Sequence, residues 1–145
     1  MSQVESSNMN ESVWNLNTEI ASIPTKGCQL IGMIREKLIE LGWVESDVFK
    51  IHMALEEAIM NAIKHGNELI EEKKVSVEIN IESDWFKADI ADEGDGFERE
   101  DVPDPTLEQN LLKESGRGLM LIEKFMNSVE YQGNGNRVKM TKQKS

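Results

Sequence analysis

Hydrophobic and polar residues alternate along five short stretches of the chain. At residues 14–20, 75–82 and 86–90 the alternation is typical of strands with one buried face, and the last two form a hairpin. Residues 129–131 and 137–140 predict a closing hairpin around a Gly-Asn-Gly turn. The pattern therefore predicts five strands, four of them in hairpins.

Hydrophobic residues at intervals of three and four predict two helices between the first and second strands. The first runs from about residue 25 to residue 41, and Gly42 is suited to end it because glycine readily adopts the left-handed conformation found after helices. The second begins with Ser46 or Asp47 as its N-cap and runs to about His65. A helical pair is thus expected beside the strands.

The stretch from residue 93 to residue 118 breaks every periodicity and is rich in glycine and acidic side chains. A loop of this length in a small domain is usually functional or disordered. Helical spacing returns at residues 119–126. The predicted order is strand, helix, helix, strand, strand, loop, helix, strand, strand, without an internal repeat or a domain linker.

Length and composition fit a single domain. The chain has 145 residues, of which 39% are hydrophobic, enough for one core. It contains no apolar stretch of the ~18 residues that a membrane helix needs, and its first ten residues lack the features of a signal peptide. Cys28 is the only cysteine, so neither an intrachain disulfide nor a cysteine zinc site is expected. We expect a cytoplasmic protein that does not enter membranes.

The formal net charge of −11 disfavours nonspecific binding to DNA, RNA or an anionic membrane, because each of these is a polyanion. Basic or mixed protein partners fit better. A nucleotide remains compatible if its phosphates meet backbone N–H groups, a metal ion or a lysine.

The first group of candidate residues lies on the second predicted helix. At about 100° per residue, Glu57, Asn61 and Lys64 fall within roughly 60° of one another, beside the apolar face. The amide oxygen of Asn61 can bind Mg²⁺, and Glu57 can accept a proton from an attacking hydroxyl. The alternative is a solvated helix flank. His52 and His65 receive no role, because no second metal-binding side chain is placed beside them.

The second group is Asp92-Glu93-Gly94-Asp95-Gly96-Phe97, directly after a predicted strand. The glycines allow the backbone to approach a flat ligand closely, and the Asp92 carboxylate can accept a hydrogen bond from an exocyclic amine such as that of adenine. A glycine-rich turn with solvated acids is the alternative. Calcium binding is disfavoured because the segment lacks the ligand series of an EF-hand loop.

The third group, Ser115-Gly116-Arg117-Gly118-Leu119, opens the third predicted helix. Glycines there expose unpaired N–H groups at the positive end of the helix dipole, where phosphate oxygens bind. Arg117 adds charge or pairs with a nearby carboxylate. A helix-entry turn without a ligand is the alternative, and the spacing matches neither the P-loop nor the dinucleotide-binding fingerprint.

In this order the three groups resemble the N, G1 and G2 boxes of the histidine-kinase-like (GHKL) ATPase superfamily. Residues 57–66, 92–97 and 115–122 look like those of the bacterial anti-sigma-factor serine/threonine kinases. The Asp-Pro-Thr at 104–106 and the Asn-Leu-Leu at 110–112 look like the lid of that subfamily. The resemblance covers nearly the whole chain.

The resemblance implies an α/β (α+β) two-layer sandwich, with helices on one face of a mixed, mostly antiparallel sheet and ATP held beneath a lid. Glu57 matches the general base, Asn61 the Mg²⁺ ligand and Asp92 the carboxylate that recognises adenine. The other residues expected around the nucleotide are Lys64, Gly94, Gly96, Phe97, Gly116, Arg117, Gly118 and Leu119.

The expected organisation is a frayed N-terminus at 1–11, one ATP-binding domain at 12–141 with its lid at about 98–115, and a tail at 142–145. The resemblance implies a kinase that transfers phosphate from ATP to a serine or threonine of a small anti-sigma-factor antagonist, and that alternatively sequesters a sigma factor. It also makes a homodimer plausible. A nucleotide-dependent binding module with little turnover, and a regulator of another signalling partner, remain alternatives.

Overall fold

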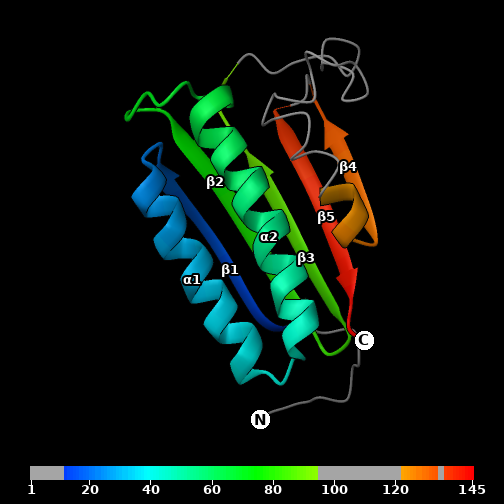
Figure 1. Ribbon diagram of the computed structural model, residues 1–145. Coiled ribbons are helices and arrows are strands. Elements are labelled where there is room, and N and C mark those ends of the chain that lie inside the picture. Colours follow the sequence, from blue (N-terminus) through cyan, green and yellow to red (C-terminus); the bar gives the residue numbers. More distant parts are fainter. Residues whose placement is uncertain (1–11, 95–121, 134–135) are drawn as a thin grey trace, which may run out of the picture.

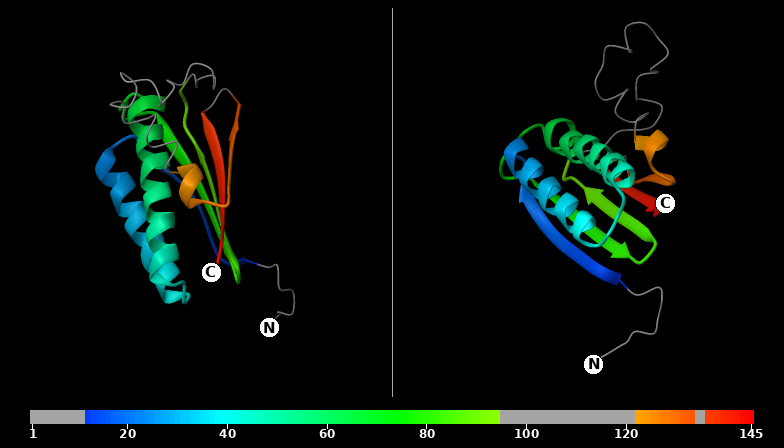
Figure 2. Two further views of the ribbon diagram at one scale, coloured as in Figure 1. Left: turned by 45° about the vertical axis from the view of Figure 1, so that its right-hand side comes forward. Right: turned by 60° about the horizontal axis from the view of Figure 1, so that its bottom comes forward.

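The chain forms two layers, a five-stranded sheet and helices that cover one of its faces (Figure 1). The computed structural model describes residues 12–94, 122–133 and 136–145. Seen along other directions, both long helices lie on the same side of the sheet, and the opposite face carries no helix of the described residues (Figure 2). The predicted two-layer α/β architecture is confirmed.

Every strand pairing in the described residues is antiparallel, and the sheet order is β1-β2-β3-β5-β4. The expected sheet of mixed direction is therefore, in this part of the chain, wholly antiparallel. The strands are β1 (Ser12–Ala21), β2 (Lys74–Glu82), β3 (Trp85–Ala91), β4 (Ser128–Gln132) and β5 (Arg137–Gln143). Both predicted hairpins, β2 with β3 and β4 with β5, are confirmed.

The first helix, α1 (Pro24–Glu40), ends as its sequence predicts. Gly42 has φ +88° and donates to the carbonyl of Ile39, while the N–H of Trp43 donates to the carbonyl of Leu38 at 3.0 Å. This pair of bonds is the Schellman motif, in which a left-handed residue satisfies the last carbonyls of a helix.

The second helix, α2 (Glu45–Asn61), begins earlier than expected. Its N-cap is Val44, which makes no side-chain cap, so the prediction that Ser46 or Asp47 caps the helix is wrong. Asp47 lies within the first turn and is 1% exposed. Its carboxylate accepts hydrogen bonds from the distant Ser145 instead, so a tertiary contact has taken the place of a local cap.

The core lies between the helices and the inner face of the sheet. Along β2 the inward residues are fully buried and alternate with more exposed ones, as its sequence predicts. The largest buried side chains include residues of α1, α2 and three strands: Ile34, Leu38, Ile51, Leu55, Ile59, Ile79, Ile81, Phe86, Ile90 and Met140. Among the described residues, no helix is long and apolar enough to cross a membrane.

Candidate functional site

The end of α2 carries the first group of candidate residues. Glu57 and Asn61 lie in its last turns and are partly exposed. The helix then widens into a π-helical turn, η2 (Ala62–Gly66), on which Lys64 is exposed. The predicted 60° arc assumes α-helical geometry from Glu57 to Lys64. That geometry is present between Glu57 and Asn61, but Lys64 lies in the π-helical turn. Single π-helical turns occur frequently at functional sites.

The second group comes to the same edge of the sheet, because β3 runs toward the end of α2 (Figure 1). Gly66 at the end of η2 lies against the carboxylate of Asp92, and a Cβ added at Gly66 would overlap it. A Cβ added at Gly94 would in turn overlap the carbonyl oxygen of Gly66. The two glycines therefore bring the helix end and the post-strand loop together.

This contact gives Gly94 a structural role, and its predicted close approach to a ligand stays a prediction. The space of its missing Cβ is occupied by the chain's own backbone. Residues 92–94, directly after β3, are consequently held against the helix end by main-chain packing.

The backbone of Asp92 is fixed from the other side by the turn between β4 and β5. Its N–H donates to the carbonyl of Asn136 at 2.9 Å, and the Asn136 side chain donates to the carbonyl of Asp92 at 3.3 Å. The Asp92 carboxylate accepts from the N–H of Gly94 at 2.8 Å. A residue whose backbone is held twice and whose carboxylate accepts one bond is suited to present an acceptor to a ligand.

Burial raises the pKa of the Asp92 carboxyl above its ordinary value, because desolvation disfavours the charged form. The N–H of Gly94 and the positive charge of Lys73 act in the opposite direction without cancelling the rise in this pKa. A desolvated acidic group with few partners is a common feature of binding sites.

Asn67, which immediately follows η2, is not among the residues that the sequence singles out. It is 0% exposed. Its side-chain N–H groups donate to Ser22 Oγ at 2.8 Å and to the carbonyl of Lys74 at 3.0 Å. Its oxygen accepts from the N–H of Glu93 at 2.8 Å. The residue thus joins three segments around the Asp92 loop.

The described structure therefore brings Gly66, at the end of the helix motif, together with Asp92 and Gly94 of the Asp-x-Gly-x-Gly motif. Several other candidates, and the expected lid, lie outside the described residues: Gly96, Phe97, Gly116, Arg117, Gly118, Leu119 and about 98–115. Within the described ranges, no group of three His, Cys, Asp or Glu residues could hold a metal by itself.

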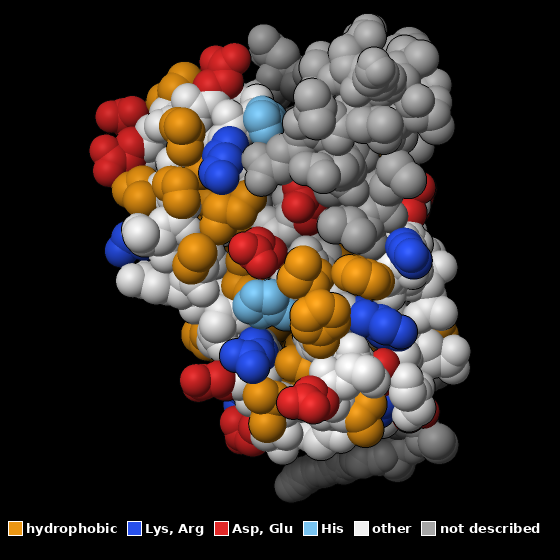
Figure 3. All heavy atoms as spheres, viewed as in Figure 1, with side chains coloured by type: hydrophobic (Ala, Val, Ile, Leu, Met, Phe, Trp, Pro, Cys, Tyr) orange, Lys and Arg blue, Asp and Glu red, His pale blue; other side chains and the backbone are white. Residues whose placement is uncertain are grey.

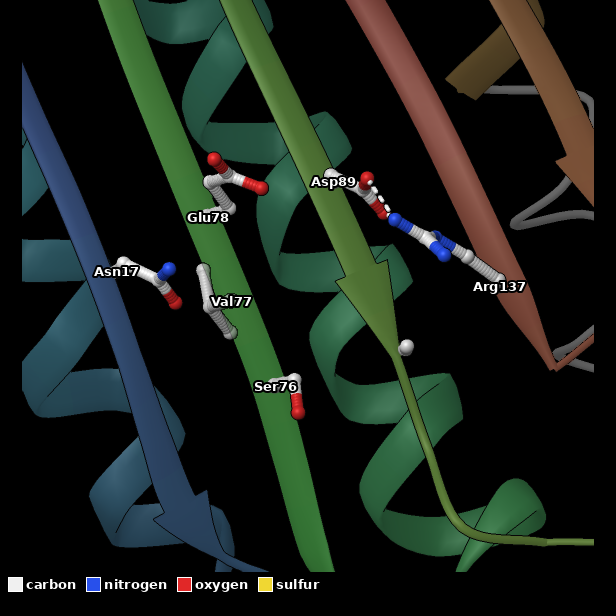
Figure 4. A pocket seen from close by; sticks show the side chains of 7 residues that line it. Asn17, Ser76, Val77, Glu78, Asp89 and Arg137 are labelled. Atoms are coloured by element: carbon white, nitrogen blue, oxygen red, sulfur yellow. Dashed lines mark hydrogen bonds and ion pairs between the residues drawn. The ribbon is translucent and has the colours of Figure 1, made fainter.

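A separate hollow lies on the helix-free face of the sheet (Figure 4). Its charged residues are Glu78, Asp89 and Arg137, and Arg137 forms a bidentate ion pair with Asp89 at 2.9 and 2.7 Å. The hydrogen bonds and charge of Asp89 raise the pKa of Arg137. The arginine is thus engaged within the sheet, and the hollow contains none of the candidate nucleotide-binding residues.

The helical face presents hydrophobic side chains among charged ones (Figure 3). Exposed large residues of the two helices include Met33, Ile39 and Phe49. Phe49 packs edge to face on Phe125, with ring centroids 6.2 Å apart. Apolar residues gathered on a surface are typical of protein contact sites.

A helix-covered antiparallel sheet, with an Asn-containing helix end packed against an Asp-x-Gly loop, defines an ATPase domain of the histidine-kinase-like class. Residues 29–142 match the family described as histidine kinase-like ATPase domain, and the chain belongs to it.

Among its relatives, the serine-protein kinase RsbW of Bacillus velezensis is 32% identical over 79% of this chain and 78% of that protein. The RsbW of Bacillus subtilis is 31% identical over the same shares. An anti-sigma F factor of Clostridium perfringens is 38% identical over 55% of this chain and 59% of that protein.

A solved structure of the RsbU and RsbW domains of a Mycobacterium tuberculosis protein superposes with a TM-score of 0.58 and 17% identity. The match covers 91% of this chain and 32% of that one. At this identity the likeness concerns the fold.

Proposed function

We propose that the chain is an ATP-dependent serine/threonine protein kinase that acts as an anti-sigma factor. It phosphorylates a small anti-sigma-factor antagonist and, in the alternative complex, sequesters a sigma factor. The names of the relatives, serine-protein kinase and anti-sigma F factor, support both parts of the proposal. The structural observation that supports it is the packing of the half-buried Asp92 against Gly66 at the end of η2.

The donor set fits a nucleotide with Mg²⁺. Asn61 offers one amide oxygen, and Mg²⁺ in nucleotide sites characteristically takes one or two protein oxygens and completes its shell with water and phosphate. Asp92 offers an acceptor to the adenine amine. When bound, Mg²⁺ would offset charge on the phosphates. Lys64, exposed on the π-helical turn, is available to add positive charge.

Transfer requires a bond from the serine or threonine oxygen to the γ-phosphorus, while the bond between that phosphorus and the leaving ADP breaks. Glu57 accepts the hydroxyl proton in this proposal. Positioning of the reactants provides most of the acceleration in such reactions, so one correctly placed carboxylate suffices as base.

The partner choice follows from the same site. Phosphorylation adds nearly two negative charges to the antagonist, which weakens its contact with a kinase of net charge −11 and releases the kinase for the sigma factor. The exposed hydrophobic residues of the helical face are compatible with protein partners. We further propose a cytoplasmic protein that forms a homodimer, which light scattering at several concentrations would test.

The test begins with titration of the protein with ATP by calorimetry, in Mg²⁺ and then in EDTA. Binding should be saturable and stronger with Mg²⁺, and Asn61→Ala should lose the Mg²⁺-dependent part. Labelled ATP and a co-encoded antagonist then test transfer. Glu57→Gln, which has the same shape without the basic group, should bind ATP and transfer no label.

Two results would contradict the proposal in different ways. A folded protein that binds no ATP would have no nucleotide site. A protein that binds ATP, sequesters its partner and never transfers label would be a nucleotide-dependent binding module, so only the kinase activity would be wrong.

A further inference from the structure

The Asn67 amide has one orientation that satisfies its surroundings. Its nitrogen faces two acceptors, Ser22 Oγ and the carbonyl of Lys74, while its oxygen faces one donor, the N–H of Glu93. A flipped amide would oppose donor to donor at Glu93. Because the side chain is fully buried, water cannot replace these partners.

Glu93 is held a second time at its other end. Its carboxylate accepts from the N–H of Lys74 at 2.5 Å. The residue that follows Asp92 is therefore fixed to the end of the helix through Asn67 and to the start of β2 through Lys74. The Glu93 carboxylate is occupied by its bond to the Lys74 N–H. Of the two neighbouring acidic residues, Asp92 is therefore the one whose carboxylate lies beside Gly66.

These contacts place Asp92 between two anchors. Asn136 holds its own N–H and carbonyl, and Asn67 holds the next N–H along the chain. Loss of the second anchor would leave the Asp92–Glu93 peptide held only by the 3.3 Å bond from Asn136 and by the Glu93 side chain. The segment could then shift, and with it the Gly94 N–H that donates to the Asp92 carboxylate. Small displacements of a positioning group are sufficient to weaken a directional contact.

We infer that Asn67 is a positioning residue that makes the nucleotide site selective for adenine, by holding the Asp92–Glu93 peptide so that the Asp92 carboxylate faces the exocyclic amine. Asn67 itself touches no nucleotide in this arrangement. The inference rests on the proposed function, because it assigns the base selectivity of the same ATP site.

Selectivity is measurable by comparing ATP with inosine triphosphate, which carries an oxygen in place of the amine. In the wild type the Asp92 carboxylate accepts from the amine of ATP and repels the oxygen of inosine triphosphate. A hydrogen bond to a charged group corresponds to a preference for ATP of about tenfold or more.

Three variants separate positioning from stability. Asn67→Ala removes all three hydrogen bonds, and Asn67→Leu does so while keeping most of the side-chain volume, so that a folded form remains available. Ser22→Ala is the matched control. It removes a buried hydroxyl that accepts from Asn67 and donates to the carbonyl of Lys73, but it leaves the bond between Asn67 and Glu93 in place.

The dissociation constants of both Mg-nucleotides are measured by calorimetry on variants that show a cooperative thermal transition. The preference for ATP should fall to within about twofold in the Asn67 variants and stay at the wild-type ratio in Ser22→Ala. A wild-type ratio in the folded Asn67 variants would overturn the inference, whatever happens to the two affinities. Absence of ATP binding by the wild type would instead overturn the proposed function.

Discussion

Asp47 provides the most direct test of how the structure is held together away from the candidate site. It is 1% exposed, at the start of α2, and accepts from the N–H and the hydroxyl of Ser145 at 2.8 and 2.7 Å. The ammonium group of Lys142 lies 3.6 Å from the same carboxylate. Asp47→Ala removes the one group that these three donors share.

Removal of one member of a buried pair costs about 3–5 kcal/mol of unfolding free energy, because the remaining charge is left uncompensated. The Lys142 side chain is 10% exposed and so keeps some contact with water, and we therefore expect the lower end, about 3 kcal/mol. For a chain of this size that corresponds to a fall in Tm of about 6–12 °C. Thermal and urea denaturation at neutral pH measure both quantities.

Lys142→Met is the matched control. It removes the ammonium group, while the Asp47 carboxylate keeps both donors from Ser145, so the loss should be clearly smaller than in Asp47→Ala. A loss below about 1 kcal/mol in Asp47→Ala would refute the reasoning, because it would mean that the cluster makes no net contribution to stability.

The pH dependence follows from the same contacts. Burial alone would raise the pKa of Asp47, but the hydrogen bonds from Ser145 and the charge of Lys142 together lower this pKa below its ordinary value. A carboxyl whose pKa is lower in the folded state than in the unfolded state stabilises the fold at pH values above its unfolded-state pKa. That contribution to stability is lost as the pH falls through the folded-state pKa. The stability difference between wild type and Asp47→Asn should therefore be constant above about pH 5 and shrink below it.

Three further predictions concern single residues. Asp92→Asn should raise Tm at neutral pH, because it removes a desolvated charge whose pKa is raised, with the gain disappearing in acid; ATP affinity in calorimetry should fall about tenfold or more. Gly94→Ala should lower Tm more than Gly66→Ala, because the added Cβ meets backbone in the first case and a rotatable carboxylate in the second. Gly42→Ala should cost about 1 kcal/mol in urea denaturation, since Gly42 has positive φ and free space around it.

The strands and the end of α1 could be predicted because each depends on a local rule. Alternation along β2 matches its alternating burial, and Gly42 ends α1 through bonds to residues within five positions. The start of α2 could not be predicted in this way. Asp47 is a good N-cap by composition, yet its partner Ser145 is 98 positions away, and no local pattern encodes that contact.

In the candidate site, too, some features follow from local sequence patterns and others depend on contacts between distant residues. Order and spacing of the motifs were enough to single out Asp92 and Gly94, but not the contact that explains the glycine, since Gly66 and Gly94 belong to separate motifs. In the sequence, Asn67 is a polar residue that follows a glycine, a combination common at helix ends, so its composition alone does not indicate a role in the site. Its bonds to Ser22 and Glu93 span 45 and 26 positions, so its role becomes evident only in the folded chain.

The residues that end η2 are also those that shape the site, and this links stability to binding. A half-buried carboxylate at Asp92 is destabilising by itself, as the direction of its pKa indicates. The fold tolerates it because Asn67, Gly94 and Asn136 satisfy the surrounding backbone. Substitutions that relieve the charge should therefore stabilise the protein and weaken ATP binding together, whereas substitutions that loosen the supporting contacts should lower both.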